Sequence, residues 1–199
     1  MRLNAIETAL MNNPVRAAIQ SRFEAERLVA MGGRLQGGRA LEVGCGRGVG
    51  VELILDRFGA SEVDAFDLDP RMLERARRRL RRRGAAVRLW VGDVSAIPAP
   101  DAAYDAVFDF GIVHHVPDWR AALREVHRVL RPGGRFYAEE VFERFIANPV
   151  WRRLLEHPQD DRFDHDRFCE GLRQAGFRLV GSQTLWSSFG WFVADRERG

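Results

Sequence analysis

Short apolar segments alternate with longer amphipathic segments along most of this chain. The short segments are apolar nearly throughout, as in strands covered on both faces, and the longer ones repeat their apolar residues at helical spacing. This alternation predicts βαβ units and a mostly parallel sheet. The predicted strands are 39–43, 62–66, 86–91, 104–110, 135–141, 177–184 and 189–195, and the predicted helices between them are 49–58, 70–83, 119–130 and 166–175.

The two ends of the chain complete an α/β fold. A first helix is predicted from Pro14, with Asn13 as its N-cap, to Gly32 and Gly33. The last two strands are joined through Ser187 and Ser188 without a helix, which predicts an antiparallel C-terminal hairpin beside the parallel strands. The expected architecture is a three-layer sandwich around a seven-stranded sheet. We expect a single domain over 1–199, with 1–33 forming an N-terminal cap helix.

Composition excludes several classes of protein. Apolar residues make up 46% of the chain, which is enough for a continuous core, and no run of them reaches the ~20 residues of a membrane span. The first residues lack the apolar centre of a signal peptide, so the expected location is cytoplasmic. Cys45 and Cys169 are far apart and are expected as reduced thiols, with no metal site. The chain contains no lysine, which excludes Schiff-base chemistry and a P-loop.

Three alternate glycines, Gly44, Gly46 and Gly48, join the first predicted sheet strand to the following helix. Glycine permits a tight turn and lets a ligand approach the backbone, because no Cβ intervenes. The dinucleotide pattern G-x-G-x-x-G needs a glycine at position 49, which is valine. The spacing therefore favours a nucleotide-type ligand without a pyrophosphate. The alternative is a tight turn that binds nothing.

Acidic residues end the next two predicted strands. Asp67 lies roughly 20 residues beyond the loop, where a carboxylate suits the hydroxyls of a ribose. Asp93 is placed to accept a hydrogen bond from an adenine amino group. A helix cap or turn is the alternative role for both, and it is the role expected of Asp69 before Pro70.

Motifs in order over 39–140 resemble those of class I S-adenosylmethionine-dependent methyltransferases, in the small-molecule branch that includes quinone-ring methyltransferases. The matching segments are the loop 42–48, the segment 67–76, Gly92-Asp93-Val94, the fourth strand 104–108 with His114-His115-Val116, and Val129-Leu130-Arg131-Pro132-Gly133-Gly134. The resemblance implies a Rossmann-like fold, the cofactor S-adenosyl-L-methionine and the product S-adenosyl-L-homocysteine.

The resemblance also implies roles for individual residues. The loop, steadied by Glu42, is expected to hold the methionine portion of the cofactor through Gly44, Cys45, Gly46 and Gly48. Asp67 is expected to bind the ribose, and the adenine is expected to contact Leu68, Asp93 and Val94. The cofactor's amino group is expected near the backbone of Asp109 and Phe110. The cap helix is expected to cover the cofactor.

Methyl transfer from a sulfonium is a single in-line displacement, so the protein needs to orient the acceptor and exclude water. Orientation can contribute ~7–11 kcal/mol, and no protein nucleophile is required. His115 and His114 follow the fourth strand, and either is a candidate general base or substrate contact. The alternative is that the pair only shapes the pocket.

Residues 141–165 are the predicted variable substrate region, to which Trp151 belongs. Trp151 and Trp186 are candidate substrate contacts and favour an apolar or aromatic acceptor, whereas the alternative for the C-terminal aromatics is a place in the core. Neither the accepting atom nor the oligomeric state follows from the sequence.

Three other functions compete with methylation of a small molecule. The basic helix Arg71–Arg83 is compatible with RNA or DNA methylation. However, Met72, Leu73, Ala76 and Leu80 predict a buried face that leaves its arginines solvated, and Asp109-Phe110-Gly111-Ile112 lacks the prolines of the amino-methylating D/N-P-P-aromatic motif. A non-catalytic binding module would be expected to have a damaged loop. Decarboxylation or cyclisation with the same cofactor stays open. We therefore expect a small-molecule acceptor and no nucleic-acid partner.

Overall fold

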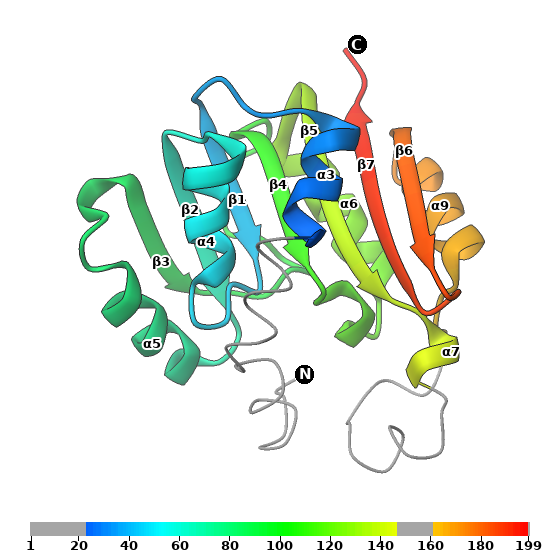
Figure 1. Ribbon diagram of the computed structural model, residues 1–199, viewed down its shortest axis with the longest axis horizontal. Coiled ribbons are helices and arrows are strands. Elements are labelled where there is room, and N and C mark those ends of the chain that lie inside the picture. Colours follow the sequence, from blue (N-terminus) through cyan, green and yellow to red (C-terminus); the bar gives the residue numbers. More distant parts are fainter. Residues whose placement is uncertain (1–22, 147–160, 199) are drawn as a thin grey trace.

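The computed structural model describes residues 23–146 and 161–198, which form one seven-stranded sheet with helices on both faces (Figure 1). The strand order is β3-β2-β1-β4-β5-β7-β6. The strands are β1 (Arg39–Val43), β2 (Glu62–Asp67), β3 (Val87–Val91), β4 (Tyr104–Phe110), β5 (Leu130–Val141), β6 (Phe177–Leu185) and β7 (Phe189–Arg196). The first five strands pair in parallel, and β7 runs antiparallel to both β5 and β6. The predicted sheet and terminal hairpin are confirmed.

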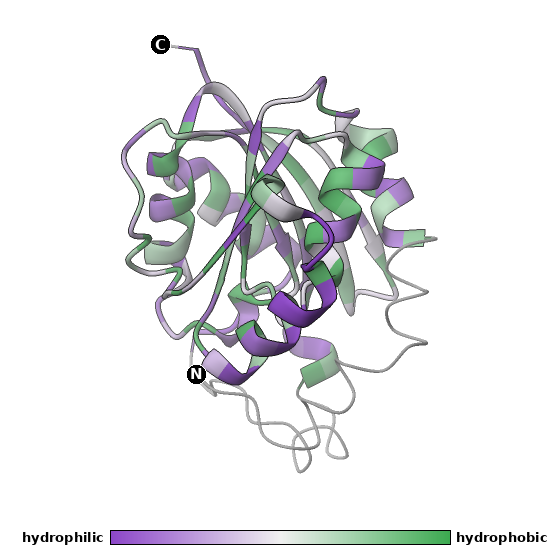
Figure 2. Ribbon diagram, turned by 90° about the vertical axis from the view of Figure 1, so that its left-hand side faces the viewer, coloured by the Kyte–Doolittle hydropathy of each residue, from purple (hydrophilic) through white to green (hydrophobic). Residues whose placement is uncertain are grey.

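Helices form the outer layers of the sandwich. They are α3 (Ala25–Gly32), α4 (Val49–Leu53), α5 (Pro70–Leu80), α6 (Trp119–Val129), α7 (Glu143–Ile146) and α9 (His165–Gln174), with short π or 3₁₀ turns at Ile54–Phe58, Gly84–Ala86 and Val113–His115. Buried side chains of α3, α4 and α5 pack in one core cluster, and those of α6 and α9 in another. Figure 2 shows helices on either side of the sheet. None of the helices within 23–146 and 161–198 is long and apolar enough to cross a membrane.

Most boundaries agree with the prediction to within one residue, and the three larger differences have local reasons. The helix predicted over 70–83 ends at Leu80, its last buried residue, because three consecutive arginines follow and offer no apolar side chain to another turn. The helix predicted over 49–58 changes to a π-helix at Ile54 before Gly59 ends it at φ +83°. β5 begins at Leu130 rather than at 135, and its pairing with β4 shifts register between Tyr104 and Ala106.

Part of the first predicted helix lies outside the described residues, including Asn13 and Pro14. Its described part, α3, ends at Gly32, and Gly33 follows at φ +76°, as the sequence predicts. α3 is attached to the sheet through β5, since the hydroxyl of Tyr137 donates to the carbonyl oxygens of Gly32 at 3.1 Å and Gly33 at 3.0 Å.

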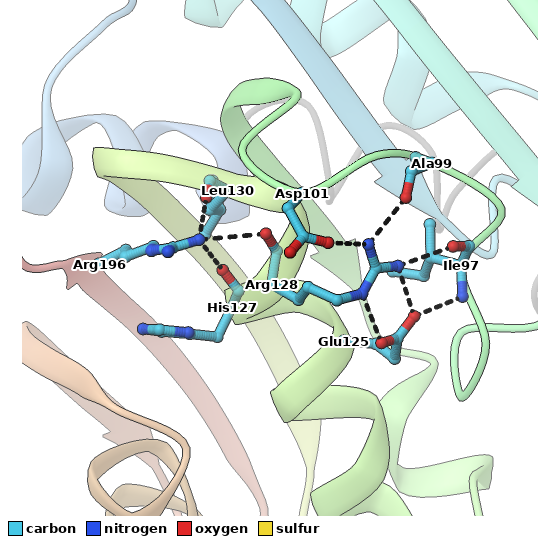
Figure 3. A network of polar contacts seen from close by, with 8 residues as sticks. All are labelled: Ile97, Ala99, Asp101, Glu125, His127, Arg128, Leu130 and Arg196. Carbon is cyan, nitrogen blue, oxygen red and sulfur yellow. Dashed lines mark hydrogen bonds and ion pairs between the residues drawn. The ribbon is translucent and has the colours of Figure 1, made fainter.

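Arg128 and Arg196 form networks of hydrogen bonds where α6 leads into β5 (Figure 3). One guanidinium nitrogen of Arg196 donates to the carbonyl oxygens of His127, Arg128 and Leu130 at 2.7–3.1 Å. These carbonyls belong to the last turn of a helix, whose acceptors otherwise lack intrahelical partners. Arg128 binds Glu125 and Asp101 and the backbone of the loop before β4, so this loop is held against α6.

Arg196→Met should lower the free energy of unfolding by about 1–3 kcal/mol, because a charged donor to three helix-end carbonyls is lost. Urea denaturation followed by circular dichroism measures the change. Arg124→Met, on the exposed side of α6, is the matched control and should change stability by less than about 0.5 kcal/mol. Equal effects of the two substitutions would contradict the capping role of Arg196.

Candidate functional site

The candidate site lies where the parallel strands end, at the lower edge of the sheet in Figure 1. In an open α/β sheet, ligands bind outside the carboxyl ends of the strands, where the direction of the strand order reverses. Here that reversal lies between β1 and β4, which are neighbours in the sheet but not in the chain. The ends of β1, β2, β4 and β5 bring together Glu42, Asp67, Asp109 and Glu140.

The glycine loop adopts backbone conformations that favour glycine. Gly44, Gly46 and Gly48 have φ values of +69°, +51° and +83°. A Cβ on Gly44 would lie 2.5 Å from Ile112, whereas a Cβ on Gly46 would meet no atom within 4 Å. Gly46 therefore borders open space in which a ligand can approach the backbone.

Asp67 fastens this loop. Its Oδ2 accepts from the backbone N of Gly46 at 2.8 Å, and its Oδ1 accepts from the backbone N of Asp69 at 2.8 Å. Burial raises the pKa of the Asp67 carboxyl, and these backbone hydrogen bonds oppose that rise. The sequence placed Asp67 at the site but did not reveal its role in shaping the loop.

Glu42 is buried beneath the loop. A Cβ on Gly50 would lie 2.0 Å from its Oε1, so the glycine lets α4 approach the carboxyl group. The pKa of Glu42 is raised well above its usual range by burial and then by the nearby Asp67 and Asp109, while a hydrogen bond from the backbone of Val51 acts in the other direction. Within the described chain, its buried Oε2 has no hydrogen-bond partner.

A second buried cluster joins β4 to β5. The Oε1 of Glu140 accepts from the backbone N of Val113 at 2.9 Å, and its Oε2 contacts the Nδ1 of His114 at 2.6 Å. Burial raises the pKa of Glu140 to about 7. Burial, and then the charge of Glu140, raises the pKa of Asp109 well above its usual range. The side chains of Asp109, Glu140 and His114 are thus coupled in one low-dielectric site.

Glu140 was not among the residues expected from the sequence. The feature that could have indicated it is the pair Glu139-Glu140 at the end of an apolar strand. Charged side chains are almost never fully buried without a partner, so a glutamate on a buried strand is expected to have one. The ring of His115 lies against that of His114, with centroids 4.2 Å apart. His114 also lines a small hollow with Val116, Trp119 and Phe163 and with residues of α7. This hollow borders the predicted variable region.

These groups fit S-adenosylmethionine. Glu42 and Asp109 are buried and Asp67 is partly buried, and burial raises the pKa of all three, so a cation beside them would favour their ionised forms and would itself be stabilised. The cofactor carries two positive centres, a sulfonium and an ammonium group. The unpartnered oxygen of Glu42 and the open space at Gly46 lie on the same loop.

The remaining predicted residues occupy different environments. The carboxylate of Asp93 accepts from the backbone N and hydroxyl of Ser95 at 2.9 and 2.7 Å, which is the turn role. Asp69 caps α5 through the backbone N of Arg71, as expected. The Val94 side chain is buried in the core, which leaves its backbone for a ligand, and Leu68 is 38% exposed.

The loop thiol and the aromatic residues predicted for the site lie in different environments. Cys45 is a free, buried thiol whose pKa is raised well above its usual range, first by burial, so it is an inert loop residue. Phe110 is buried against Phe108. Trp186 is 78% exposed, and it and Ser187 form the tip of the β6–β7 hairpin, one residue earlier than predicted. Trp151 lies outside the described residues.

Residues 40–134 match the family model described as the methyltransferase domain. The segment 40–134 is therefore similar to methyltransferase domains. The chain is 41% identical over 118 residues to the malonyl-[acyl-carrier protein] O-methyltransferase of Serratia marcescens, covering 59% of this chain and 44% of the relative. It is 36% identical over 121 residues to the fatty-acid O-methyltransferase of Mycolicibacterium smegmatis, covering 61% of this chain and 43% of the relative.

The fold of the chain is also found in solved structures. The Haloferax volcanii putative methyltransferase, solved in complex with the Trm112 methyltransferase activator, matches with a TM-score of 0.79 at 18% identity over 99% of both chains. Such a low identity establishes the fold alone. The chain spans about half the length of the curated relatives it matches.

Glu140→Gln should make the stability of the protein less dependent on pH. Burial raises the pKa of Glu140 from its usual 4.5 to about 7, so between these pH values the folded state holds a proton that the unfolded state has released. Stability from this group is therefore present below pH 4.5 and lost as the pH rises to 7, by up to about 3 kcal/mol. Urea denaturation at several pH values measures the slope.

Glu143→Gln, at an exposed position of α7, is the control and should keep the wild-type slope. A slope in Glu140→Gln as steep as that of the wild type would show that Glu140 does not titrate in this window.

Proposed function

We propose that this chain transfers a methyl group from S-adenosylmethionine to an oxygen atom of a small apolar molecule. The observation that carries the proposal is the set of buried carboxyl groups around a glycine loop with open space at Gly46. The loop is intact, which disfavours a non-catalytic binding module. The two free thiols suit a reducing compartment, and we propose the cytoplasm.

When bound, the cofactor supplies an electrophilic methyl group on a sulfonium that leaves as a neutral thioether. The chain's own residues bind and orient it. Asp67 accepts from the ribose hydroxyls with the lone pairs that its two backbone hydrogen bonds leave available. Leu68 covers the adenine, and the backbones at Val94 and Asp93 contact its edge. Glu42 and Asp109 supply the negative charge that favours the cation.

An oxygen acceptor is supported by the names of two relatives, which are O-methyltransferases of malonyl-[acyl-carrier protein] and of fatty acids. A carboxylate acceptor is already ionised and needs orientation alone, whereas a phenol or quinol must lose a proton. The apolar side chains of Val116, Trp119 and Phe163 lie beside His114 and favour an apolar acceptor. We place the acceptor on the His114 side of the cofactor site, where the predicted variable region begins.

His114 is the proposed general base for an acceptor that carries a proton. The sequence favoured His115, but the contact of His114 Nδ1 with the buried Glu140 supports His114, because a carboxylate on one ring nitrogen fixes the tautomer and raises the basicity of the other. Glu140 is then a positioning residue. His115, stacked on His114, holds the ring in place.

Calorimetric titration of the purified protein should give micromolar-range binding of S-adenosylmethionine and S-adenosylhomocysteine and no binding of NAD or FAD. Asp67→Ala should weaken cofactor binding at least about 100-fold, since both the ribose contact and the fastening of the glycine loop are lost. Asp93→Ala, whose carboxylate serves a turn, is the comparison variant and should lose less. Wild-type affinity in Asp67→Ala would sink the ribose assignment.

His114→Ala should slow methylation of phenols and quinols about 10²–10⁴-fold at neutral pH, the usual contribution of a general base. Carboxylic acids should be affected much less. Glu140→Gln should shift the pH profile of kcat for phenols without changing cofactor affinity, because it acts on the basicity of His114. If His115→Ala shows the phenol-selective loss and His114→Ala does not, the roles of the two histidines are reversed.

A further inference from the structure

Helix α5 and the turn after it carry an unusual concentration of positive charge. Between positions 71 and 83 there are eight arginines and one glutamate, whereas the formal net charge of the whole chain is +3. In Figure 2, where this side of the molecule faces the viewer, α5 is largely hydrophilic. The proposed methyl transfer uses none of these arginines.

The arginines lie on the solvent side of α5. Its buried face consists of Met72, Leu73, Ala76 and Leu80. On the other side, Arg71, Arg75 and Arg78 follow the i, i+4, i+7 spacing that aligns residues along one face of a helix, and Arg82 lies in the turn that follows. The helical part of this arginine stripe extends for roughly 10 Å, at about 1.5 Å per residue. Arg71 and Arg78 have side chains that are 70% and 77% exposed.

Only part of this charge is neutralised within the molecule. Four arginines pair with carboxylates: Arg71 with Asp69, Arg78 with Glu74, Arg79 with Glu52 and Arg83 with Asp56. Arg75, Arg77, Arg81 and Arg82 form no ion pair with any residue in the described ranges 23–146 and 161–198. The pKa of Arg47, on the glycine loop, is lowered by burial and then by repulsion from Arg79 and Arg75.

The shape of this surface also suits an anionic partner. Arg78, Arg79, Arg81, Arg82 and Arg83 line a hollow of about 550 Å³ together with Glu52. Within this hollow Arg79 and Arg83 already pair with Glu52 and Asp56, so the charge left for a partner is that of Arg81 and Arg82, which form no ion pair with a described residue. The bidentate fork of donors on a guanidinium group is well matched to carboxylates.

The side chains on this surface favour some classes of anionic partner over others. Residues 71–88 contain no aromatic side chain on which a base could stack, which disfavours single-stranded nucleic acid. The apolar face of α5 is buried in the core, so the helix cannot insert that face into a lipid surface. Carboxylates presented by a protein remain the best match for the stripe.

We propose that the arginine stripe of α5 and of the turn after it docks an acidic protein that carries the methyl acceptor. The proposal rests on the methyl-transfer function and names the form in which the acceptor arrives. The stripe begins at Arg71, directly after Asp69 caps α5 and four residues after Asp67 of the candidate site. A partner aligned along the stripe therefore has one end beside the cofactor site, where a tethered acceptor can enter.

The test uses the whole chain and an acyl carrier protein as the acidic probe. Binding is measured by fluorescence anisotropy at about 50 and 200 mM salt. The double variant Arg75→Glu/Arg82→Glu breaks no ion pair with a described residue and leaves the buried face of α5 intact. Arg124→Glu, on α6 across the sheet, is the matched control. Titration with S-adenosylmethionine reports on the fold and cofactor site of each variant.

We expect the carrier protein to bind the wild type and Arg124→Glu equally, at least about tenfold more weakly at the higher salt, and at least about tenfold more weakly to the double variant. Cofactor affinity should be the same in all three proteins. Absence of carrier binding, or equal binding to the double variant, overturns the docking proposal. Stripe-dependent binding of tRNA or of anionic lipid vesicles without carrier binding overturns it in favour of those partners.

The two proposals fail in different ways. If S-adenosylmethionine binds but the carrier protein does not, docking is wrong and methyl transfer stands. If the carrier protein binds the stripe while S-adenosylmethionine does not bind at all, the proposed function is wrong.

Discussion

The hydrogen bond from the backbone of Gly46 to the Asp67 carboxylate is the constraint on which the site depends. It ties the loop after β1 to the end of β2, across two strands that pair in register from Arg39 and Glu62 onward. The left-handed backbone of Gly46 presents its N–H to that carboxylate, and its missing side chain leaves the adjacent space open. This interaction thus fixes the loop and the opening for a ligand, and the other oxygen of Asp67 holds the turn into α5 through the backbone N of Asp69.

The free-energy cost of burying charged carboxyl groups explains the raised pKa values at the site. Burying carboxyl groups without a cation is unfavourable, and the raised pKa values of Glu42, Asp109 and Glu140 express that cost. A positively charged ligand offsets it, so binding and stability are coupled in this protein. The opposite arrangement exists on α5, where an anionic partner would relieve the repulsion among arginines. Both surfaces are therefore complementary to partners of opposite charge, and they meet where Asp67 and Asp69 lead into α5.

The sequence predicted most of the fold because its signals are local. Apolar strands, Pro70 after the capping Asp69, and glycines at helix ends each act within a few residues, and they located all seven strands and the hairpin. Errors arose where packing decided the outcome. α5 ended with its last buried side chain at Leu80, and β5 began early because Leu130 pairs with Tyr104 before the register shifts.

The sequence by itself determined the strands and helices, the glycine loop and the position of Asp67. Each of these depends on backbone conformations or residue spacings within one βα unit. Only the tertiary structure decided how distant residues combine. Glu140 lies 26 positions from His114, and the parallel pairing of β4 with β5 brings them into contact. Burial, which depends on every layer of the fold, then raised the pKa of Glu140 to about 7.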